Sequence, residues 1–168
     1  ANPKDLHEQY VQADVEEIKR ELGKKTGDVF LINTSRLVDQ KGHDLTIRAL
    51  TYLPEHIKYV AVGDGEAEPK LRSLVKELGL KKRVIFTGRV ERSVVTLYRK
   101  AGDIFVAPSR SEGLGNAFIS ALASRIPLIT TGAGGIADYA IDNETAWIVP
   151  QEDAKAIANK VLEVLESP

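Results

Sequence analysis

The chain has 168 residues, of which 43% are hydrophobic, and its 23 basic and 24 acidic side chains leave a net charge of -1. This length and apolar content suit one domain with a sizeable core. The near-zero charge argues against nucleic acid as the main partner, because proteins that bind phosphate backbones usually carry a basic excess. We interpret the one dense basic run, Lys81-Lys82-Arg83, as solvated surface.

The sequence also argues against metal sites and membrane spans. It contains no cysteine, which excludes disulfides and thiolate ligands, and His7, His43 and His56 match no metal-ligand spacing. No apolar run approaches the ~20 residues that cross a bilayer, and the polar N-terminus does not look like a signal peptide. We therefore expect a cytoplasmic domain, with any membrane contact made only through a larger parent protein.

The first predicted element is a helix that Asp14 caps and that ends at Gly23. Its apolar face consists of Val15, Ile18 and Leu22. Six short apolar runs follow, and their β-branched residues are typical of strands buried on both faces. The runs are residues 29–33, 59–62, 84–86, 104–106, 128–130 and 147–149.

Helical spacing separates these runs. One helix carries Leu71, Leu74 and Leu78 and ends at Gly79, and Asp153 caps the last one. The apolar stripe of that last helix consists of Ala154, Ile157, Ala158, Val161, Leu162 and Leu165. Strands that alternate with helices predict an α/β fold: a single Rossmann-like, doubly wound parallel sheet of about six strands with helices on both faces.

The loops that follow the strands are the place to look for chemistry. In such sheets ligands bind at the carboxyl ends of the strands, beside the point where the strand order reverses. The sequence predicts that five loops share this rim, and three of them contain paired glycines that allow a ligand to approach the backbone. The loops are residues 35–42, 63–66, 88–92, 109–116 and 132–135.

The first and fourth of these loops carry groups suited to a phosphorylated sugar. In the first, the forked guanidinium of Arg36 and the ammonium of Lys41 suit a diphosphate, although both are compatible with plain solvated surface. In the fourth, residues 113–116 precede a predicted helix, whose N-terminal amides favour an anion. Glu112 either favours that helix dipole or accepts hydrogen bonds from sugar hydroxyls.

Familiar nucleotide-binding patterns are incomplete. Gly113-x-Gly115 approaches the dinucleotide fingerprint but lacks the third glycine and follows the fourth predicted strand rather than the first. No phosphate loop of the G-x-x-x-x-G-K-[ST] type occurs anywhere in the sequence. Simple NAD-binding or ATP-hydrolysing functions are therefore disfavoured.

Taken in order, the loops resemble the donor-binding C-terminal half of retaining GT-B glycosyltransferases, typified by glycosyltransferase family 4. Residues 35–42 resemble the G-R-L-x-x-x-K-G loop of that family, and residues 60–65 its G-x-G loop. Residues 86–90 are similar to its F-x-G-x-V segment, 102–109 to A-D-x-F-V-x-P-S, and 112–116 to E-G-x-G/P. The resemblance runs from about residue 27 to residue 166, with the motifs in family order.

The resemblance implies a role for each matching residue. Arg36 and Lys41 would hold the donor diphosphate, Glu112 would contact the transferred sugar, and Arg89 and Val90 would lie beside the nucleotide base. The glycine loops would supply close backbone contacts. These loop residues are Gly63, Gly65, Gly113, Leu114, Gly115 and Asn116.

One departure from the family pattern matters most, beside Asp138 for a commoner glutamate and Ala146 for a usual glycine. Ser120 stands where the second glutamate of an E-x7-E motif, which binds the ribose hydroxyls in the family, is expected. Losing hydrogen bonds to a charged acceptor costs about 1.5–3 kcal/mol, so we expect weakened donor binding.

The resemblance implies metal-independent, cofactor-free transfer from a UDP-, GDP- or ADP-sugar, with an N-terminal acceptor domain in the parent protein. We expect a helix and tether over residues 1–26 and the Rossmann-like nucleotide-sugar-binding domain over residues 27–168. The isolated domain is not expected to transfer sugar without the acceptor half. The alternative is a non-catalytic or engineered scaffold of the same fold, with little or no nucleotide binding.

Overall fold

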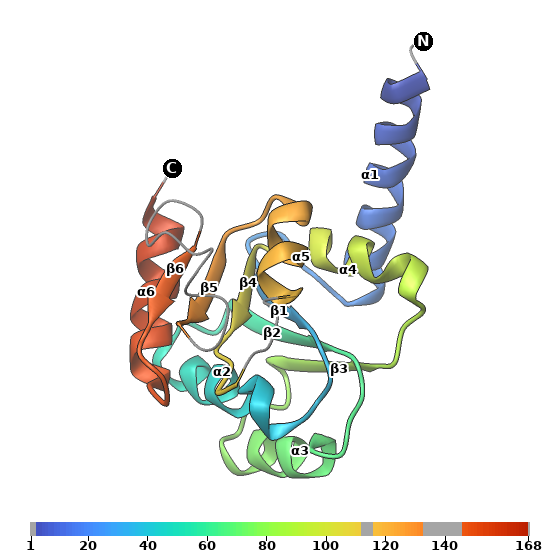
Figure 1. The fold of residues 1–168 in the computed structure, drawn as a ribbon. Helices are drawn as coiled ribbons and strands as arrows, with labels where there is room; N and C mark the ends of the chain where they lie inside the picture. Colours follow the sequence, from blue (N-terminus) through green and yellow to red (C-terminus); the bar gives the residue numbers. More distant parts are fainter. Residues whose placement is uncertain (1–2, 112–115, 133–145, 168) are drawn as a thin grey trace.

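A computed structural model of the chain describes residues 3–111, 116–132 and 146–167, and its core is a six-stranded sheet (Figure 1). All neighbouring strands pair in parallel, in the order β3-β2-β1-β4-β5-β6. The predicted doubly wound α/β fold is therefore confirmed. The strands are β1 Val29–Thr34, β2 Ile57–Val62, β3 Val84–Gly88, β4 Ile104–Ala107, β5 Leu128–Thr131 and β6 Trp147–Val149.

Helices cover both faces of the sheet. α2 (His43–Ala49), α3 (Glu68–Glu77) and α6 (Ala154–Glu166) pack on one face, where they share an apolar cluster with β1 and β2. On the other face lie α1 (Pro3–Glu21), α4 (Val95–Ala101) and α5 (Asn116–Ser124). This arrangement buries the inner strands β1, β2, β4 and β5 on both sides, which explains why they are continuous apolar runs rather than alternating ones.

Three of the predicted helix ends are right and one is wrong: Gly23 follows α1 in the left-handed conformation, with a φ of 74°. Gly79 follows α3 in the left-handed conformation, with a φ of 68°, and the Asp153 carboxylate accepts a hydrogen bond from the Ala156 amide at the start of α6. Asp14, however, lies inside α1, which begins at Pro3. No glycine or proline occurs between Pro3 and Asp14, so nothing in that stretch interrupts the helix.

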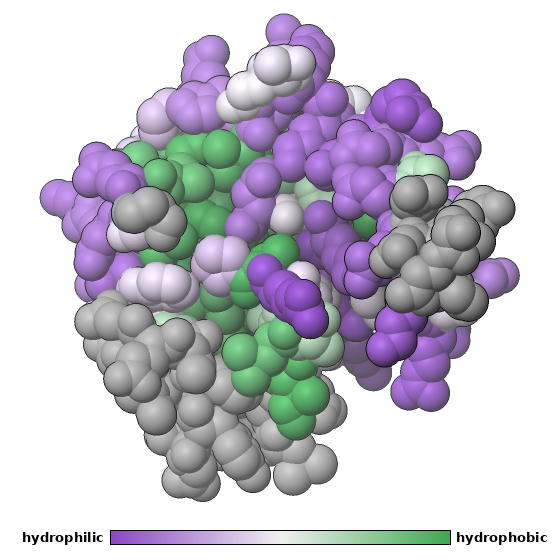
Figure 2. All heavy atoms as spheres, turned by 90° about the horizontal axis from the view of Figure 1, so that it is seen from above, coloured by the Kyte–Doolittle hydropathy of each residue, from purple (hydrophilic) through white to green (hydrophobic). Residues whose placement is uncertain are grey.

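Two helices keep large apolar side chains on the surface. In α6 the buried positions include Val164, whereas Leu162 and Leu165, which the sequence placed in the apolar stripe, are exposed. In α5, Ile119 and Leu122 are exposed as well. Seen from above, hydrophobic residues show through the middle of a face whose margins are hydrophilic (Figure 2).

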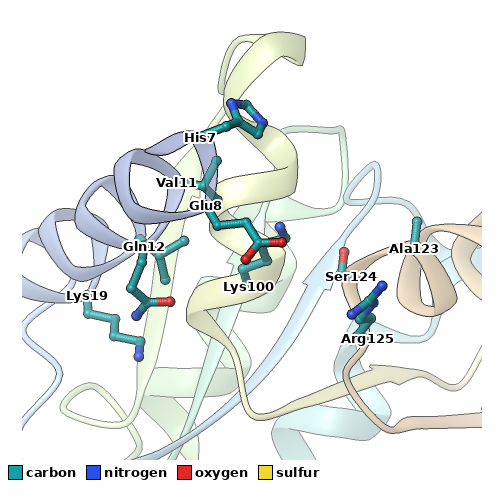
Figure 3. A pocket seen from close by; sticks show the side chains of 10 residues that line it. His7, Glu8, Val11, Gln12, Lys19, Lys100, Ala123, Ser124 and Arg125 are labelled. Carbon is teal, nitrogen blue, oxygen red and sulfur yellow. The ribbon is translucent and has the colours of Figure 1, made fainter. Parts of the chain in front are cut away.

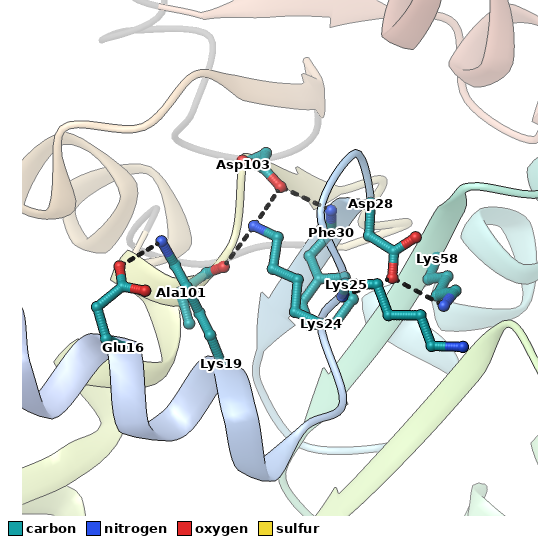
Figure 4. A network of polar contacts seen from close by, with 9 residues as sticks. All are labelled: Glu16, Lys19, Lys24, Lys25, Asp28, Phe30, Lys58, Ala101 and Asp103. Carbon is teal, nitrogen blue, oxygen red and sulfur yellow. Dashed lines mark hydrogen bonds and ion pairs between the residues drawn. The ribbon is translucent and has the colours of Figure 1, made fainter.

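A polar network ties the segment before β1 to the start of β4 (Figure 4). The Asp103 carboxylate accepts hydrogen bonds from the Phe30 amide and from Lys24 Nζ, each at 2.7 Å. Lys24 Nζ also donates to the Ala101 carbonyl at 3.2 Å and lies 5.1 Å from the centre of the Phe30 ring. The Asp103 carboxylate thus accepts from the main-chain N–H of Phe30 in β1 and holds Lys24, which follows α1, at the start of β4.

We predict that Asp103→Ala lowers the free energy of unfolding by about 1–3 kcal/mol, because the amide of fully buried Phe30 loses its acceptor. Asp103→Asn is the matched control: its amide oxygen still accepts from Phe30, and only the ion pair with Lys24 is lost. Urea unfolding of both variants measures the difference. Equal stability of the two variants would contradict the assignment.

Candidate functional site

The strand order brings the loop after β1 into contact with two other loops. β1 lies between β2 and β4, so its carboxyl end stands beside theirs. Backbone hydrogen bonds join Leu37 N–H to the Asp64 carbonyl at 2.9 Å, and Arg110 N–H to the Gln40 carbonyl at 2.8 Å. The loop after β1 is therefore fixed on one side to the loop after β2, and on the other to the loop after β4.

Glycines make this close contact possible at two points. Gly42 has a φ of 71°, and a Cβ there would overlap the carbonyl oxygen of Pro108. Gly63 has a φ of 138°, and a Cβ there would overlap the carbonyl oxygen of Ser35. Any other residue would push the loop after β1 away from its neighbours, in addition to straining the backbone.

His43, the first residue of α2, supports the same loop from below. Its Nε2 lies 3.0 Å from the Arg36 carbonyl oxygen and 3.1 Å from Ser35 Oγ, and its Nδ1 lies 2.6 Å from the Tyr59 hydroxyl. A carbonyl only accepts hydrogen bonds, so Nε2 carries the proton and the hydroxyl of Tyr59 donates to Nδ1. A neutral imidazole therefore links β2 to the backbone of Arg36.

Burial keeps this imidazole neutral. Desolvation lowers the pKa of His43 from 6.5 to about 4, outweighing the opposite effect of its hydrogen bond to the Arg36 carbonyl. Burial likewise raises the pKa of Tyr59, which is fully buried, so the phenol stays protonated and able to donate. Both groups hold the loop in their uncharged forms at neutral pH.

Arg110 fixes the other side of the loop through charge. Its guanidinium donates to both carboxylate oxygens of Asp44 at 2.9 and 2.8 Å, to the Asp39 carbonyl at 2.8 Å, and to Glu152 in front of α6. Burial, the largest single effect, raises the pKa of Asp44, but the hydrogen bonds and the charge of Arg110, with smaller contributions from a backbone hydrogen bond and Arg48, together lower it. Arg110 thereby connects the turn before Lys41 to α2 and α6.

Four of the predicted site residues line one hollow at the carboxyl ends of β1 to β3. Its volume is about 170 Å³, and its wall includes the backbone of Gly63 and the side chains of Arg36, Arg89 and Val90. A second open hollow, of about 730 Å³, adjoins it and shares Arg89 and Val90. The Arg36 and Arg89 side chains are exposed, and neither makes an ion pair with a described residue.

The other predicted residues are distributed around this hollow. Lys41 is half-buried at the far end of the first loop, and Gly65 packs against Leu37. Asn116 begins α5, and Ser120 lies one turn further along that helix, partly exposed. Four predicted residues lie outside the described part of the chain: Glu112, Gly113, Leu114 and Gly115.

Several residues that line or support the hollow were not among the predictions. The hollow is also lined by Thr34, Ser35, Val62, Asp64 and Val95. All of these except Val95 lie at or just beyond the ends of predicted strands, so their position was a signal that could have been found from the sequence. His43 and Arg110 had no such signal. Their partners are Tyr59, 16 positions away from His43, and Asp44, 66 positions away from Arg110.

A third hollow, of about 610 Å³, lies between α1 and the end of α5 (Figure 3). Charged and polar side chains such as Glu8, Lys19, Lys100 and Arg125 line it, and no predicted site residue does. Within the described residues, no group of three or more His, Asp or Glu side chains could hold a metal ion. No helix in that part of the chain is long and apolar enough to span a membrane.

Comparison with known proteins identifies the family. The profile of the glycosyl transferases group 1 family matches residues 14–168. The chain belongs to this family. Among curated group 1 relatives, the lipopolysaccharide core biosynthesis mannosyltransferase LpcC of Rhizobium leguminosarum is 33% identical over 141 residues. These residues are 79% of this chain and 40% of that protein, so the chain spans about two fifths of the length of the relative.

Solved structures of group 1 proteins and related chains have the same fold. The C-terminal domain of a group 1 family protein (LpcC) from Francisella tularensis is 26% identical, with a TM-score of 0.73 over 83% of this chain and 76% of that one. Anabaena HepE, crystallised with UDP and glucose, is 23% identical, with a TM-score of 0.86 over 92% of this chain and 43% of that one. The chain is thus a C-terminal-type GT-B domain.

We predict that the stability of this group 1 domain falls below pH 6.5 through His43. Because the pKa of His43 is lower in the folded chain than in the unfolded one, the unfolded chain takes up the proton first as the pH falls. The free energy of unfolding should therefore drop from pH 6.5 downwards, by about 3 kcal/mol once pH 4 is passed.

His43→Gln is the matched variant, since its amide still donates to the Arg36 carbonyl but does not titrate. Urea unfolding at several pH values compares it with the parent chain, and other groups contribute equally to both. A parent chain that loses no more stability than the variant between pH 7 and about pH 4.5 would refute the role of His43.

Proposed function

We propose that this chain is the nucleotide-sugar donor-binding domain of a retaining glycosyltransferase. The observation that carries the proposal is the hollow at the carboxyl ends of β1 to β3, where Arg36, Gly63, Arg89 and Val90 come together. It lies beside the reversal of strand order between β1 and β4, the position at which open α/β sheets bind nucleotides. In this pose the base lies against Arg89 and Val90.

The diphosphate then lies along the loop after β1. Arg36 offers paired donors at one end of this loop and Lys41 an ammonium at the other, and the N-terminus of α5 adds the positive end of a helix dipole. During transfer, negative charge grows on the departing diphosphate, and these fixed positive groups stabilise it without a metal ion. Glu112 would orient the sugar, a role that rests on the sequence motif alone.

The relatives support a nucleotide sugar as the ligand and leave its identity open. HepE was crystallised with UDP and glucose, and a mannosyltransferase of Mycolicibacterium smegmatis that is 31% identical to this chain is GDP-mannose-dependent. Two different bases thus occur among similar proteins. A UDP-, GDP- or ADP-sugar remains the proposed donor, in a cytoplasmic setting.

The acceptor side would be supplied by a separate N-terminal domain of the parent protein. The chain covers 40% of the length of the Rhizobium relative, which leaves the rest of such a protein to provide acceptor contacts. We therefore propose that this domain alone binds donor but does not transfer the sugar. If the purified chain alone released nucleotide from the donor only when an acceptor was added, that part of the proposal would be wrong.

We predict that Arg36→Ala weakens binding of the preferred nucleotide sugar by about tenfold or more, because a charge-assisted hydrogen bond is worth about 1.5–3 kcal/mol. Calorimetric titration with UDP-, GDP- and ADP-sugars identifies the preferred donor and measures the loss. Arg48→Ala is the control, since Arg48 is an exposed arginine of α2 that does not line the hollow.

The titration also separates the two candidate functions. If none of the three nucleotide sugars binds or raises the thermal midpoint at millimolar concentration, the chain is a scaffold of this fold rather than a donor-binding domain. Equal weakening by Arg36→Ala and Arg48→Ala would mean that the donor binds elsewhere.

We predict that Ser120→Glu tightens donor binding by about tenfold, because a carboxylate can take both ribose hydroxyls that a single hydroxyl cannot. Ser120→Gln is the matched control, being similar in length but uncharged. The same titration measures both variants. A donor affinity unchanged by the glutamate would mean that the ribose does not lie over this turn of α5.

A further inference from the structure

The amino ends of the strands form a second rim, and a large hollow opens there. Its volume is about 1000 Å³, and it lies between the starts of β1, β2 and β3 and the end of α3. Residues that precede β1, such as Lys25 and Asp28, face residues that precede β3, such as Lys82. β1 has six residues, so roughly 20 Å of strand separates this rim from the donor site.

Positive charge is concentrated in this hollow. Of its ten lining residues six are lysine or arginine and two are carboxylates, although the whole chain has a net charge of -1. The Asp28 carboxylate is already matched, since Lys58 Nζ lies 2.9 Å from it and the Lys25 amide also donates to it. Both hydrogen bonds lower the pKa of Asp28, and the one from Lys58 has the larger effect.

The remaining lysines form no ion pair with a described residue, although the charge of Lys25 also acts on Asp28. Lys25, Lys76, Lys81 and Lys82 are exposed, and none of their ammonium groups pairs with a described carboxylate. Four like charges around one hollow repel each other, and Asp28 and Glu55, its two carboxylates, are outnumbered, so an external anion would relieve this repulsion. The run at residues 81–83 therefore belongs to a cluster that includes residues far from it in sequence.

Arg83 gives the hollow a rigid base. Its Nε and Nη2 donate to the carbonyls of Ile57, Leu53 and Pro54 at 2.8–3.2 Å, with no carboxylate among these acceptors. The side chain is thus held in place by neutral groups, and the charge of Glu55, which also lines the hollow, acts on it without an ion pair. A fixed guanidinium with four mobile ammonium groups around it suits a ligand with several anionic oxygens.

One part of the cluster has a simpler explanation. Lys76 lies in the last turn of α3, where a cation favours the negative end of the helix dipole. That effect accounts for a single charge near one helix end. It does not account for Lys25, which precedes β1, or for the fixed Arg83.

We propose that this hollow binds a ligand with clustered phosphate groups, independently of the donor site. Such a ligand comes from two sources, a free oligophosphate or a phosphorylated headgroup, and the hollow recognises the chemistry that they share. The concave shape favours a discrete group of phosphates that enters between Lys25 and Lys82. Sugar donors bind at the opposite rim, so the two sites do not compete.

The test uses inorganic tripolyphosphate in one arm. In the other arm it uses vesicles of phosphatidylcholine with about 5% phosphatidylinositol bisphosphate. Both are measured on the chain carrying Arg36→Ala, so that the diphosphate loop binds the probe more weakly. We expect saturable binding that weakens as salt rises from about 50 mM to about 300 mM. Lys81→Glu with Lys82→Glu should weaken it by about tenfold or more, since each reversal replaces attraction by repulsion.

The control is Lys100→Glu with Lys155→Glu, which changes the net charge equally at exposed positions away from the hollow. Amide shifts in NMR spectra should map the tripolyphosphate to residues around Lys25, Lys76 and Lys82. Binding in the first arm alone identifies a free oligophosphate, and binding to vesicles identifies a headgroup. No binding in either arm, or equal loss in the control, overturns the proposal.

Equal thermal unfolding of the two double variants checks that folding is unaffected. Nucleotide-sugar affinity, measured on the chain with Arg36 intact, should be unchanged by the Lys81 and Lys82 reversals. The proposal thus stands or falls separately from the donor-binding function.

Discussion

The reversal of strand order at β1 is the constraint on which the rest of the structure depends. β1 has β2 on one side and β4 on the other, so the chain after β1 runs between two other strand ends. There it is fixed from both sides, by Asp64 and by Arg110, and from below by His43. A loop held on three sides presents its side chains in one arrangement, which lowers the entropic cost of binding a ligand.

The loop is held by two different physical means. Beneath it, His43 and Tyr59 are buried and neutral, since a buried charge without a partner would be costly. Beside it, Arg110 is charged and partly exposed, and its hydrogen bonds to Asp44 and Glu152 raise its pKa. Because Arg110 is already paired, it is a structural cation rather than a free phosphate ligand. Arg36 has no such partner among the described residues, which leaves its guanidinium available.

The sequence predicted the strands well because burial on both faces leaves an unmistakable apolar run. The Trp147–Val149 strand matches its prediction, and the others extend it by one or two residues at an end. The start of α1 was wrong because a good N-cap at Asp14 does not stop a helix when the residues before it also favour one. Propensity is local, and continuation of the helix is decided by the whole segment.

Of the candidate site, motif order predicted Arg36, Gly63, Arg89 and Val90, which the fold brings to one hollow. The supporting contacts were not predictable, since they depend on how distant elements pack. Tyr59 reaches His43 because α2, which His43 begins, packs over β2. For the same reason the sequence could not show that the Lys81-Lys82-Arg83 run lies around the same hollow as Lys25.

A parallel sheet makes its two rims electrostatically different. Helices that follow the strands begin at the carboxyl rim and end at the amino rim, so their dipoles favour anions at the first and cations at the second. In the proposed donor pose, the backbone at the carboxyl rim therefore assists Arg36 and Lys41 in holding the diphosphate. At the amino rim any anion must be held by side chains alone, against the helix dipoles. Binding of the proposed phosphate ligand at that rim is therefore expected to depend strongly on salt.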